Sequence, residues 1–354
     1  MAKNVGIDLG TTNVLVNLYG KGIILNEPSA VAIDTRSQEV IAIGHEAYEM
    51  LGRTPESIQV IQPLKGGVIA DFDIAEAMLM LFMQRLNLTS WFAKPNVLIC
   101  APSKVSEIER LALIETVERA GGGRIYLEEE PKVAGVGAGI DPLSSSGSMV
   151  IDIGGGTSDF AVISAGEVIA SESIKLAGDD LDLAIIQYLK DNFHILVGER
   201  SAESLKKAVA SAVLLPEEEV ETYDVKGRDL LTGLPKSVNV DSNMICQAIR
   251  PILIEIARVA KRVLETIPPE MAADVMEKGI LLTGGGALIY HLDTFLTDFL
   301  KVSVLKAEQP MNCVAIGSGL MLDLILSGKL ERTNPTWRQR LKRRLQRIKR
   351  RILG

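Results

Sequence analysis

Short runs of aliphatic and β-branched residues, separated by glycine-containing turns, open the chain and then return later in it. The first group predicts strands at residues 5–8, 14–18, 22–25 and 30–33. The second group predicts strands at residues 149–152, 160–164 and 167–172. Each run has the length and composition of a strand, and the turns between them suit tight connections. The pattern therefore predicts two β-meanders in one chain.

Between and after these meanders, apolar residues recur with the 3.6-residue spacing of amphipathic helices. This spacing predicts helices at 73–88, 106–120, 131–139, 180–193, 202–215, 242–267 and 314–327. The helix at 242–267 is expected to be interrupted near Pro251, because proline lacks the N–H that an inner turn uses. Short apolar runs at 96–100, 125–127 and 279–283 predict further strands. Mixed strands and helices of this kind indicate an α/β fold.

The two meanders begin with the same arrangement of residues. Residues 7–12 and 151–157 both give an apolar residue, Asp, an apolar residue, Gly and then small residues. The two stretches lie 144 positions apart, and helices follow each of them. A duplicated α/β unit with its ligand between the copies follows from this repeat. We place the boundary in the loop at 142–148, which is rich in Pro and Ser.

Composition narrows the class of protein. Hydrophobic residues make up 47% of the chain and charged residues 23%, as in ordinary soluble domains. The three cysteines, Cys100, Cys246 and Cys313, are far apart and odd in number, which argues against a disulfide framework or a zinc site and favours a reducing cytoplasm. The sequence predicts neither a signal peptide nor a membrane-spanning segment.

Charge is divided very unevenly along the chain. Residues 332–354 carry ten Lys or Arg side chains and no acidic one, whereas residues 1–331 carry 28 basic and 45 acidic side chains, a net charge of −17. The acidic body and the basic tail carry opposite net charges, so the charge of each is considered separately. Because nucleic-acid binding requires a basic face, no nucleic-acid partner is expected.

The two repeated turns carry the clearest candidate chemistry. Their Gly, Thr and Ser residues expose backbone N–H groups and hydroxyls that attract anions such as phosphate. Asp8 and Asp152 would repel phosphate directly, so they indicate an intervening cation, for which hydrated Mg²⁺ is well suited. The alternative is that each Asp only caps a tight turn. A third glycine cluster follows the strand at 279–283 and has no carboxylate, so it favours a purine or ribose, or else a simple strand–helix connection.

The combination of motifs resembles a known superfamily. Residues 8–13, 152–159, 178–180 and 283–287 resemble the two phosphate motifs and the adenosine motif of the actin, Hsp70 and sugar-kinase superfamily. More closely, residues 26–29, 67–71, 129–131, 197–200 and 282–286 resemble bacterial actin of the MreB family, in the right order across residues 4–327.

This resemblance implies a fold and a division of the chain. The implied fold is α/β, with duplicated actin-like (ribonuclease H-like) domains and a nucleotide cleft between them. The first half covers 1–142, with a C-terminal return near 313–330, and the second covers 143–330. Residues 331–354 lie beyond the segment that carries the resemblance, and their own pattern predicts a basic amphipathic tail that binds membrane.

The resemblance also implies roles for single residues. Asp8 and Asp152 are expected to hold Mg²⁺, through water, and to be catalytic together with Glu130, which would orient the attacking water. The expected contacts to ATP or ADP are Gly10, Thr11, Thr12, Asn13, Gly154, Gly155, Gly156, Thr157, Gly178, Glu203, Lys206, Gly284, Gly285, Gly286 and Ala287. Without the resemblance, Glu203 and Lys206 read as an ordinary ion pair on a helix, and Glu130 as part of an exposed acidic patch.

One segment departs from the family pattern. After Glu130-Pro131 the family usually has Met and several Ala, whereas this chain has Lys132 and three glycines within 132–139. Each glycine costs roughly 1 kcal/mol relative to alanine inside a helix, so this helix is expected to be looser. Lys132 can also pair with a nearby carboxylate. The departure bears on hydrolysis and not on nucleotide binding.

Two elements are predicted to contact a membrane. In the tail, Asn334 caps a helix with Pro335 in its first turn, and a narrow apolar stripe lies among nine Lys or Arg side chains. The stripe comprises Trp337, Leu341, Leu345, Ile348 and Ile352. The alternatives are a solvated tail, nucleic-acid contact, or docking on the acidic body. Trp91 and Phe92 occupy the place of the family's membrane-inserting loop, although aromatic side chains in loops also pack on their own domain.

Together with these features, the resemblance implies a filament-forming ATPase at the cytoplasmic face of the inner membrane that helps to determine cell shape. Its ATP hydrolysis is expected to be slow and coupled to polymerisation. Expected partners are further copies of the chain, anionic lipid and membrane-bound morphogenesis proteins. The alternatives are a small-molecule kinase of the same superfamily and a plasmid-segregating actin-like filament.

Overall fold

The computed structural model describes residues 3–88 and 93–330. The predicted membrane residues Trp91 and Phe92, and the apolar stripe of the tail, lie outside the described residues. Within the described part of the chain, no helix is long and apolar enough to cross a membrane.

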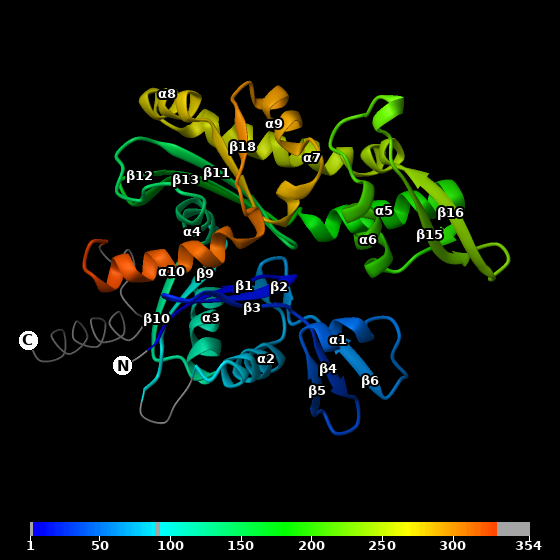
Figure 1. Cartoon of the computed structure of the whole chain (residues 1–354), viewed down its shortest axis with the longest axis horizontal. Coiled ribbons are helices and arrows are strands. Elements are labelled where there is room, and N and C mark those ends of the chain that lie inside the picture. The colour runs from blue at the N-terminus through cyan, green and yellow to red at the C-terminus, as the bar shows by residue number, and fades with distance from the viewer. Residues whose placement is uncertain (1–2, 89–92, 331–354) are drawn as a thin grey trace, which may run out of the picture.

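Two five-stranded sheets with the same strand order form the framework (Figure 1). The first sheet has the order β10-β9-β1-β2-β3 and the second β18-β17-β11-β12-β13, read in the corresponding direction. The strands of the first sheet are β1 (Asn4–Leu9), β2 (Asn13–Leu18), β3 (Gly22–Pro28), β9 (Asn96–Ala101) and β10 (Arg124–Glu129). The strands of the second sheet are β11 (Ser148–Ile153), β12 (Ser158–Ser164), β13 (Glu167–Ile174), β17 (Ile280–Thr283) and β18 (Val304–Lys306).

The directions of the strands match as well as their order. In the first sheet β1 pairs antiparallel with β2 and parallel with β9. In the second sheet β11 pairs antiparallel with β12 and parallel with β17. The predicted duplication is therefore present in the topology, and it places Asp8 on β1 and Asp152 on β11 at equivalent positions near the carboxyl ends of the central strands.

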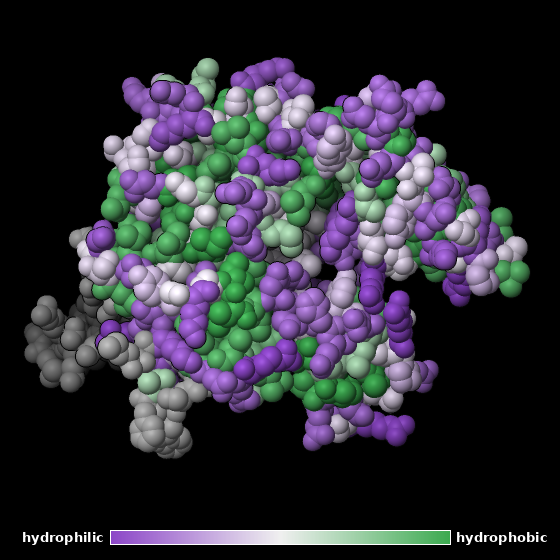
Figure 2. All heavy atoms as spheres, in the orientation of Figure 1, coloured by the Kyte–Doolittle hydropathy of each residue, from purple (hydrophilic) through white to green (hydrophobic). Residues whose placement is uncertain are grey.

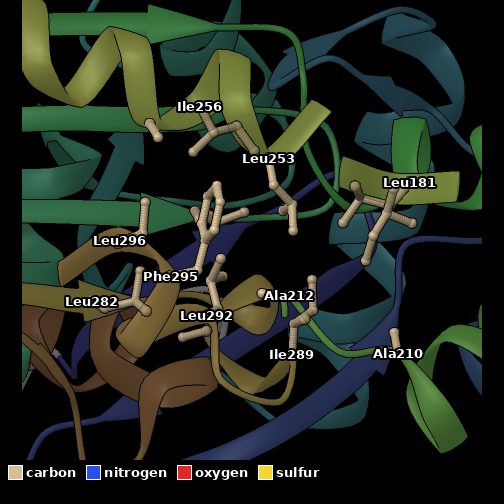
Figure 3. Packing of buried hydrophobic residues seen from close by; sticks show 14 of the residues in the cluster. Leu181, Ala210, Ala212, Leu253, Ile256, Leu282, Ile289, Leu292, Phe295 and Leu296 are labelled. Carbon is tan, nitrogen blue, oxygen red and sulfur yellow. The ribbon is translucent and has the colours of Figure 1, made fainter. Parts of the chain in front are cut away.

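Helices cover both sheets and enclose the cores. The first half carries α2 (Phe72–Arg85) and α3 (Glu107–Arg119), and the second carries α7 (Ser242–Thr266), α8 (Pro269–Lys278) and α9 (Leu292–Leu300). Figure 3 shows Leu253 and Ile256 of α7 facing Phe295 and Leu296 of α9 within the core of the second half. Aliphatic side chains dominate these cores, as the low aromatic content of 4% requires.

Each half also carries a smaller lobe at one end of the molecule. The lobe of the first half has β4 (Val31–Asp34), β5 (Val40–Ile43), β6 (Ile58–Ile61) and α1 (His45–Met50), and the hairpin of β7 (Leu64–Lys65) and β8 (Val68–Ile69) leads back from it. The lobe of the second half has α5 (Gly178–Phe193), β14 (Ile195–Leu196), α6 (Glu199–Val209), β15 (Thr222–Asp229) and β16 (Pro235–Asp241). The two lobes lie on the same side in Figure 1.

Two helices, α4 (Glu130–Gly137) and α10 (Cys313–Leu326), lie between the sheets. They approach so closely that a Cβ on Gly137 would lie 1.8 Å from the carbonyl oxygen of Cys313, and one on Gly317 would lie 1.9 Å from that of Val133. α10 also packs on β1, where a Cβ on Gly6 would meet the Ser318 hydroxyl at 1.9 Å. α10 thus contacts a strand of the first sheet, while the division of the chain at residue 142 and the return near 313–330 stay predictions.

This packing changes the interpretation of the glycines in α4. Gly139 lies beyond the end of the helix and has a φ of 101°, a conformation that suits glycine. Gly135 and Gly137 are inside the helix, where each takes a place that a larger side chain would not fit. Gly137 therefore serves close packing against α10, and Gly135 faces side chains of β11 and β12, which the expectation of a looser helix did not consider.

Two helix predictions were wrong in their bounds or continuity. The helix predicted to reach residue 215 ends at Val209, because Ala210 is extended and the Ala212 N–H donates to the Tyr290 carbonyl at 2.8 Å. The predicted interruption at Pro251 is absent, since α7 continues through it. Pro251 and Gln247 are both exposed, so water can satisfy the Gln247 carbonyl that lacks its helical donor.

Candidate functional site

A cavity of about 1410 Å³ lies between the two halves. Nearly all of the residues predicted to bind nucleotide or act in catalysis line it, although they come from distant parts of the chain. They are Asp8, Gly10, Thr11, Thr12, Asn13, Glu130, Asp152, Gly154, Gly155, Gly156, Thr157, Gly178, Glu203, Lys206, Gly284, Gly285 and Gly286. The exception is Ala287, which is buried and does not line the cavity.

The two phosphate loops close in the same way. The Gly10 N–H donates to the Asn13 carbonyl at 3.0 Å, and the Gly154 N–H donates to the Thr157 carbonyl at 2.9 Å. Each bond joins the end of a central strand to the start of the next strand, which leaves the backbone between them turned toward the cavity. The duplication in sequence is thus also a duplication of local hydrogen bonding.

The same loops also meet each other across the floor of the cavity. A Cβ on Gly155 would lie 1.9 Å from the Thr12 hydroxyl, and a Cβ on Gly156 would lie 2.6 Å from the Thr11 hydroxyl. Glycine is therefore required at both positions, because the two loops approach each other too closely for a Cβ atom. The Thr11 hydroxyl also accepts a hydrogen bond at 3.1 Å from the N–H of Gly67, at the tip of the β7–β8 hairpin.

Asp8 and Asp152 are both buried at this floor. Burial, and then the charge of Asp152, raises the pKa of Asp8 to about 7. Burial also raises the pKa of Asp152 to about 6, against the lowering effect of the Thr283 hydroxyl, which donates to its Oδ1 at 2.6 Å. Neither carboxylate is exposed at a turn: both are buried, Asp8 faces the charge of Asp152, and Asp152 faces the charge of Asp159.

Glu130 stands at the first position of α4, just before Pro131, and lines the cavity. Burial raises its pKa well above the usual range, and the charges of Asp159, Asp152 and Asp8 raise it further. It is therefore not part of an exposed acidic patch. Its neighbour Glu128 is buried as well and pairs with Lys132 at 3.1 Å, as anticipated for a lysine at that position.

On the other side of the cavity, Glu203 and Lys206 do not pair with each other. Lys206 Nζ donates to the Gly178 carbonyl at 2.7 Å and to Asp182 at 2.8 Å. Glu203 pairs instead with Lys207 at 2.6 Å. Both side chains lie along the wall formed by α6, so the ordinary ion pair on a solvated helix is not what the structure contains.

The third glycine cluster forms the opposite edge of this wall. Gly284 has a φ of 82°, and its N–H donates to the Pro310 carbonyl at 3.0 Å. A Cβ on Gly284 would meet the Ile153 carbonyl oxygen at 2.3 Å, and one on Gly286 would meet the Ile153 side chain at the same distance. Small residues are thus needed where the turn after β17 crosses β11.

Some residues of the site were not predicted individually. Asp159 is buried, and it accepts a hydrogen bond at 3.0 Å from the Ser103 N–H of the other half. Burial raises the pKa of Asp159 to about 6, against the lowering effect of the Ser103 bond. Asp159 comes two positions after the second phosphate loop, and this position in the sequence could have indicated that it belongs to the site. Tyr48 of α1 also lines the cavity, and no local pattern in the sequence marked it.

Comparison with known proteins identifies the family to which this architecture belongs. The family model for MreB/Mbl protein matches residues 2–328. The chain belongs to the MreB/Mbl family. It is 51% identical over 322 residues to the cell shape-determining protein Mbl of Bacillus subtilis (strain 168), covering 91% of this chain and 96% of that protein.

Two further members of the MreB/Mbl family extend the comparison. Identity to the cell shape-determining protein MreB of Escherichia coli (strain K12) is 43% over 329 residues, covering 92% of this chain and 94% of that protein. The crystal structure of MreB5 of Spiroplasma citri bound to ADP superposes with a TM-score of 0.88 at 36% identity, covering 93% of this chain and 98% of that one. The same protein has been solved with AMPPNP.

The predicted family and actin-like fold are therefore confirmed. The names of the relatives favour a cell-shape actin over a small-molecule kinase or a plasmid-segregating filament.

The residues at the cavity floor fit a divalent cation bound together with phosphate. Asp8 and Asp152 supply two carboxylates that burial and the repulsion of neighbouring carboxylates make costly to ionise without a cation. The described residues contain no group of three or more His, Cys, Asp or Glu side chains arranged to enclose a metal ion. This donor set suits Mg²⁺, which keeps several waters and uses one or two carboxylates plus phosphate oxygens.

These raised pKa values predict how stability depends on pH. Without metal and nucleotide, we expect the melting temperature to fall as pH rises from about 4 to about 7. The folded state holds protons on Asp8 and Asp152 that the unfolded chain releases near pH 4, so this stabilisation is complete below that pH and is lost as pH passes about 6 and about 7. Thermal unfolding in EDTA between pH 5 and about 8 measures it. A slope that is unchanged in Asp8→Asn would contradict this assignment.

Proposed function

We propose that this chain is a bacterial actin that binds ATP with Mg²⁺, hydrolyses it slowly and polymerises into filaments on the cytoplasmic face of the membrane, where it helps to determine cell shape. The observation that carries the proposal is the pair of equivalent hairpins that bring Asp8 and Asp152 to one cavity floor. The ADP-bound and AMPPNP-bound structures of a relative in the same family support the choice of nucleotide.

In this proposal the cavity divides into a phosphate side and a nucleoside side. Backbone N–H groups and hydroxyls of residues 10–13 and 154–157 bind the phosphates, since such loops attract anions. Asp8 and Asp152 hold the Mg²⁺, through water, and the ion neutralises charge on the phosphate oxygens when it is bound. Glu203, Lys206 and the turn at Gly284–Gly286 flank the nucleoside.

Glu130 orients the attacking water and accepts its proton at a carboxylate oxygen. Phosphoryl transfer to water depends on positioning and charge stabilisation, and a fixed carboxylate supplies both a hydrogen-bond acceptor and a direction. Glu130 is held at the first turn of α4, a helix anchored by the buried Lys132–Glu128 pair and by its glycine contacts with α10. This anchoring fixes where the carboxylate points.

Filament formation and membrane attachment can be tested together. Full-length protein is incubated with ATP, Mg²⁺ and liposomes containing anionic lipid, then pelleted and viewed by electron microscopy. We expect filaments lying on the liposomes. A protein that stays monomeric at high concentration, with and without lipid, would refute the proposed function.

The tail of residues 331–354 is proposed to bind anionic membrane. Removing residues 333–354, which leaves 1–332, should reduce liposome pelleting by at least about tenfold, because each basic residue near an anionic surface contributes about 1 kcal/mol and apolar burial adds to this. Co-sedimentation across a lipid titration measures the difference, with uncharged liposomes as a control. Equal binding by both forms would assign the membrane contact to Trp91 and Phe92 instead.

A further inference from the structure

The open side of the cavity is framed by one helix from each half. α1 belongs to the small lobe of the first half and α6 to the small lobe of the second, and Figure 1 shows the two helices facing each other from these lobes. In Figure 2 hydrophilic residues gather where the two lobes meet. Residues 10–13 and 154–157 line the same cavity, and Glu203 of α6 belongs to its proposed nucleoside side, so contacts between these helices lie on that side.

A set of contacts, here called the mouth contact, joins the two helices. The Tyr48 hydroxyl of α1 donates a hydrogen bond to the Glu203 carboxylate of α6. The Arg200 guanidinium lies over the Tyr48 ring, 5.6 Å from its centroid, and Arg200 Nη1 donates to the Glu49 carbonyl at 3.3 Å. Tyr48, Arg200 and Glu203 all line the cavity.

The charges of the mouth contact suit a strong hydrogen bond at neutral pH. Burial, and then the neighbouring Glu203, raises the pKa of Tyr48, so its hydroxyl keeps the proton that it donates. Burial raises the pKa of Glu203, but hydrogen bonds from Lys207 and Tyr48 outweigh that effect and the net pKa is lowered. A neutral hydroxyl donating to a carboxylate forms a charge-assisted bond, which is stronger than a neutral one.

Each partner is fixed from its own side of the opening. The Tyr48 ring packs against a small core of alanines in its own lobe, formed by Ala30, Ala32, Ala42 and Ala47. On α6, the other Glu203 oxygen is held by Lys207 at 2.6 Å. The contact therefore ties two anchored lobes, and separating them breaks a bond to a charged group and removes the cation from the aromatic face.

We propose that Tyr48 is a positioning residue of the nucleotide site: its hydroxyl holds Glu203 in place at the wall of the cavity and, together with Arg200, keeps the mouth closed over a bound nucleoside. This inference rests on the proposed nucleotide binding and goes beyond it, because it names the residue from the opposite half that limits nucleotide exchange. The phosphate end needs no such contact, since its loops already meet on the floor.

The test measures release of a fluorescent ADP analogue from full-length protein after mixing with excess ATP and Mg²⁺. The protein is kept at a concentration at which it does not pellet. Tyr48→Phe removes only the hydroxyl, and we expect release to become about tenfold faster, the factor that corresponds to losing one hydrogen bond to a charged group. Single-turnover cleavage of bound ATP should change far less than release, which a general loosening of the fold would not produce.

Tyr19→Phe is the matched control. The Tyr19 hydroxyl also faces a carboxylate, that of Asp323, but Tyr19 is half exposed and lies outside the cavity. It should release nucleotide at the wild-type rate. Arg200→Ala should speed release in the same direction as Tyr48→Phe, and the double variant should fall short of the product of the two effects, because the residues act in one contact.

The outcomes separate this inference from the function on which it rests. Failure of the wild-type protein to bind the analogue would overturn the proposed nucleotide binding. Binding by the wild type with unchanged release from Tyr48→Phe would overturn the role of Tyr48 alone. Equal acceleration by Tyr19→Phe would overturn it too. Thermal unfolding of each variant checks that it is folded under the conditions in which its release rate is measured.

Discussion

Replacing Glu130 by alanine should slow phosphate release by about a hundredfold or more while leaving ATP binding close to wild type. A positioned carboxylate that accepts the proton of attacking water contributes on the order of 10² to 10⁴ in rate. Glu130 is the cavity-lining carboxylate at the start of α4 and faces the charges of Asp159, Asp152 and Asp8. Phosphate release under single-turnover conditions measures the rate, and fluorescent-nucleotide titration measures the binding.

Two further variants sharpen this prediction. Glu130→Gln keeps the size of the side chain but cannot accept the proton, so it should be nearly as slow as the alanine variant. Glu115→Ala removes an exposed carboxylate of α3 that pairs with Arg119, and it should turn over normally. Turnover at the wild-type rate in Glu130→Ala would remove Glu130 from its proposed role. Because its pKa is raised, hydrolysis should also increase with pH as the carboxylate ionises.

Asp152→Asn should weaken binding of Mg²⁺-nucleotide by about a hundredfold and, with the metal absent, raise the melting temperature. The two effects have one cause. Asp152 is a buried carboxylate next to Asp8, which is favourable with a divalent cation and costly without one. Asparagine is close in shape and keeps an acceptor oxygen for the Thr283 hydroxyl, so the fold at the end of β11 should be retained.

Calorimetric titration and thermal unfolding in EDTA test the two parts separately. Asp191→Asn, which changes an exposed aspartate of α5, should leave both quantities unchanged. A variant that binds Mg²⁺-ATP as tightly as wild type would show that Asp152 does not hold the metal. A lowered melting temperature in EDTA would show that its carboxylate stabilises the metal-free fold, contrary to its raised pKa.

Most of the framework was predictable because its signals are local. The strands of both meanders and the helices α2, α3, α5 and α10 follow apolar spacing closely, and Ser106 caps α3 with Glu109 as a capping box. The hairpin of β15 and β16 was missed because only Val225 and Val240 of its strands are buried, so alternation of apolar and polar residues is weak. α6 was extended too far because its end depends on contacts with Tyr290, 80 residues later in the sequence.

The residues of the site also divide into those with a local signal in the sequence and those that depend on distant contacts. Asp8 and Asp152 were singled out because each stands near the end of a strand, just before a glycine-containing turn, in a pattern that repeats along the chain. Tyr48 was not found, because its importance depends on α1 and α6 lying opposite each other, which no run of residues within either helix encodes. Glu203 and Lys206 were expected to contact the nucleoside. Both line the cavity, where Lys206 pairs with Asp182 and Glu203 with Lys207.

The sequence by itself determined the duplication, the two aspartate hairpins and the family, because repeated local patterns are legible without knowing what packs against them. Only the tertiary structure decided that Gly137 of α4 fits against α10, that the charge of Asp152 raises the pKa of Asp8, and that Tyr48 crosses the cavity to Glu203. Each of these depends on atoms brought together from distant positions, where distance and burial set the energy.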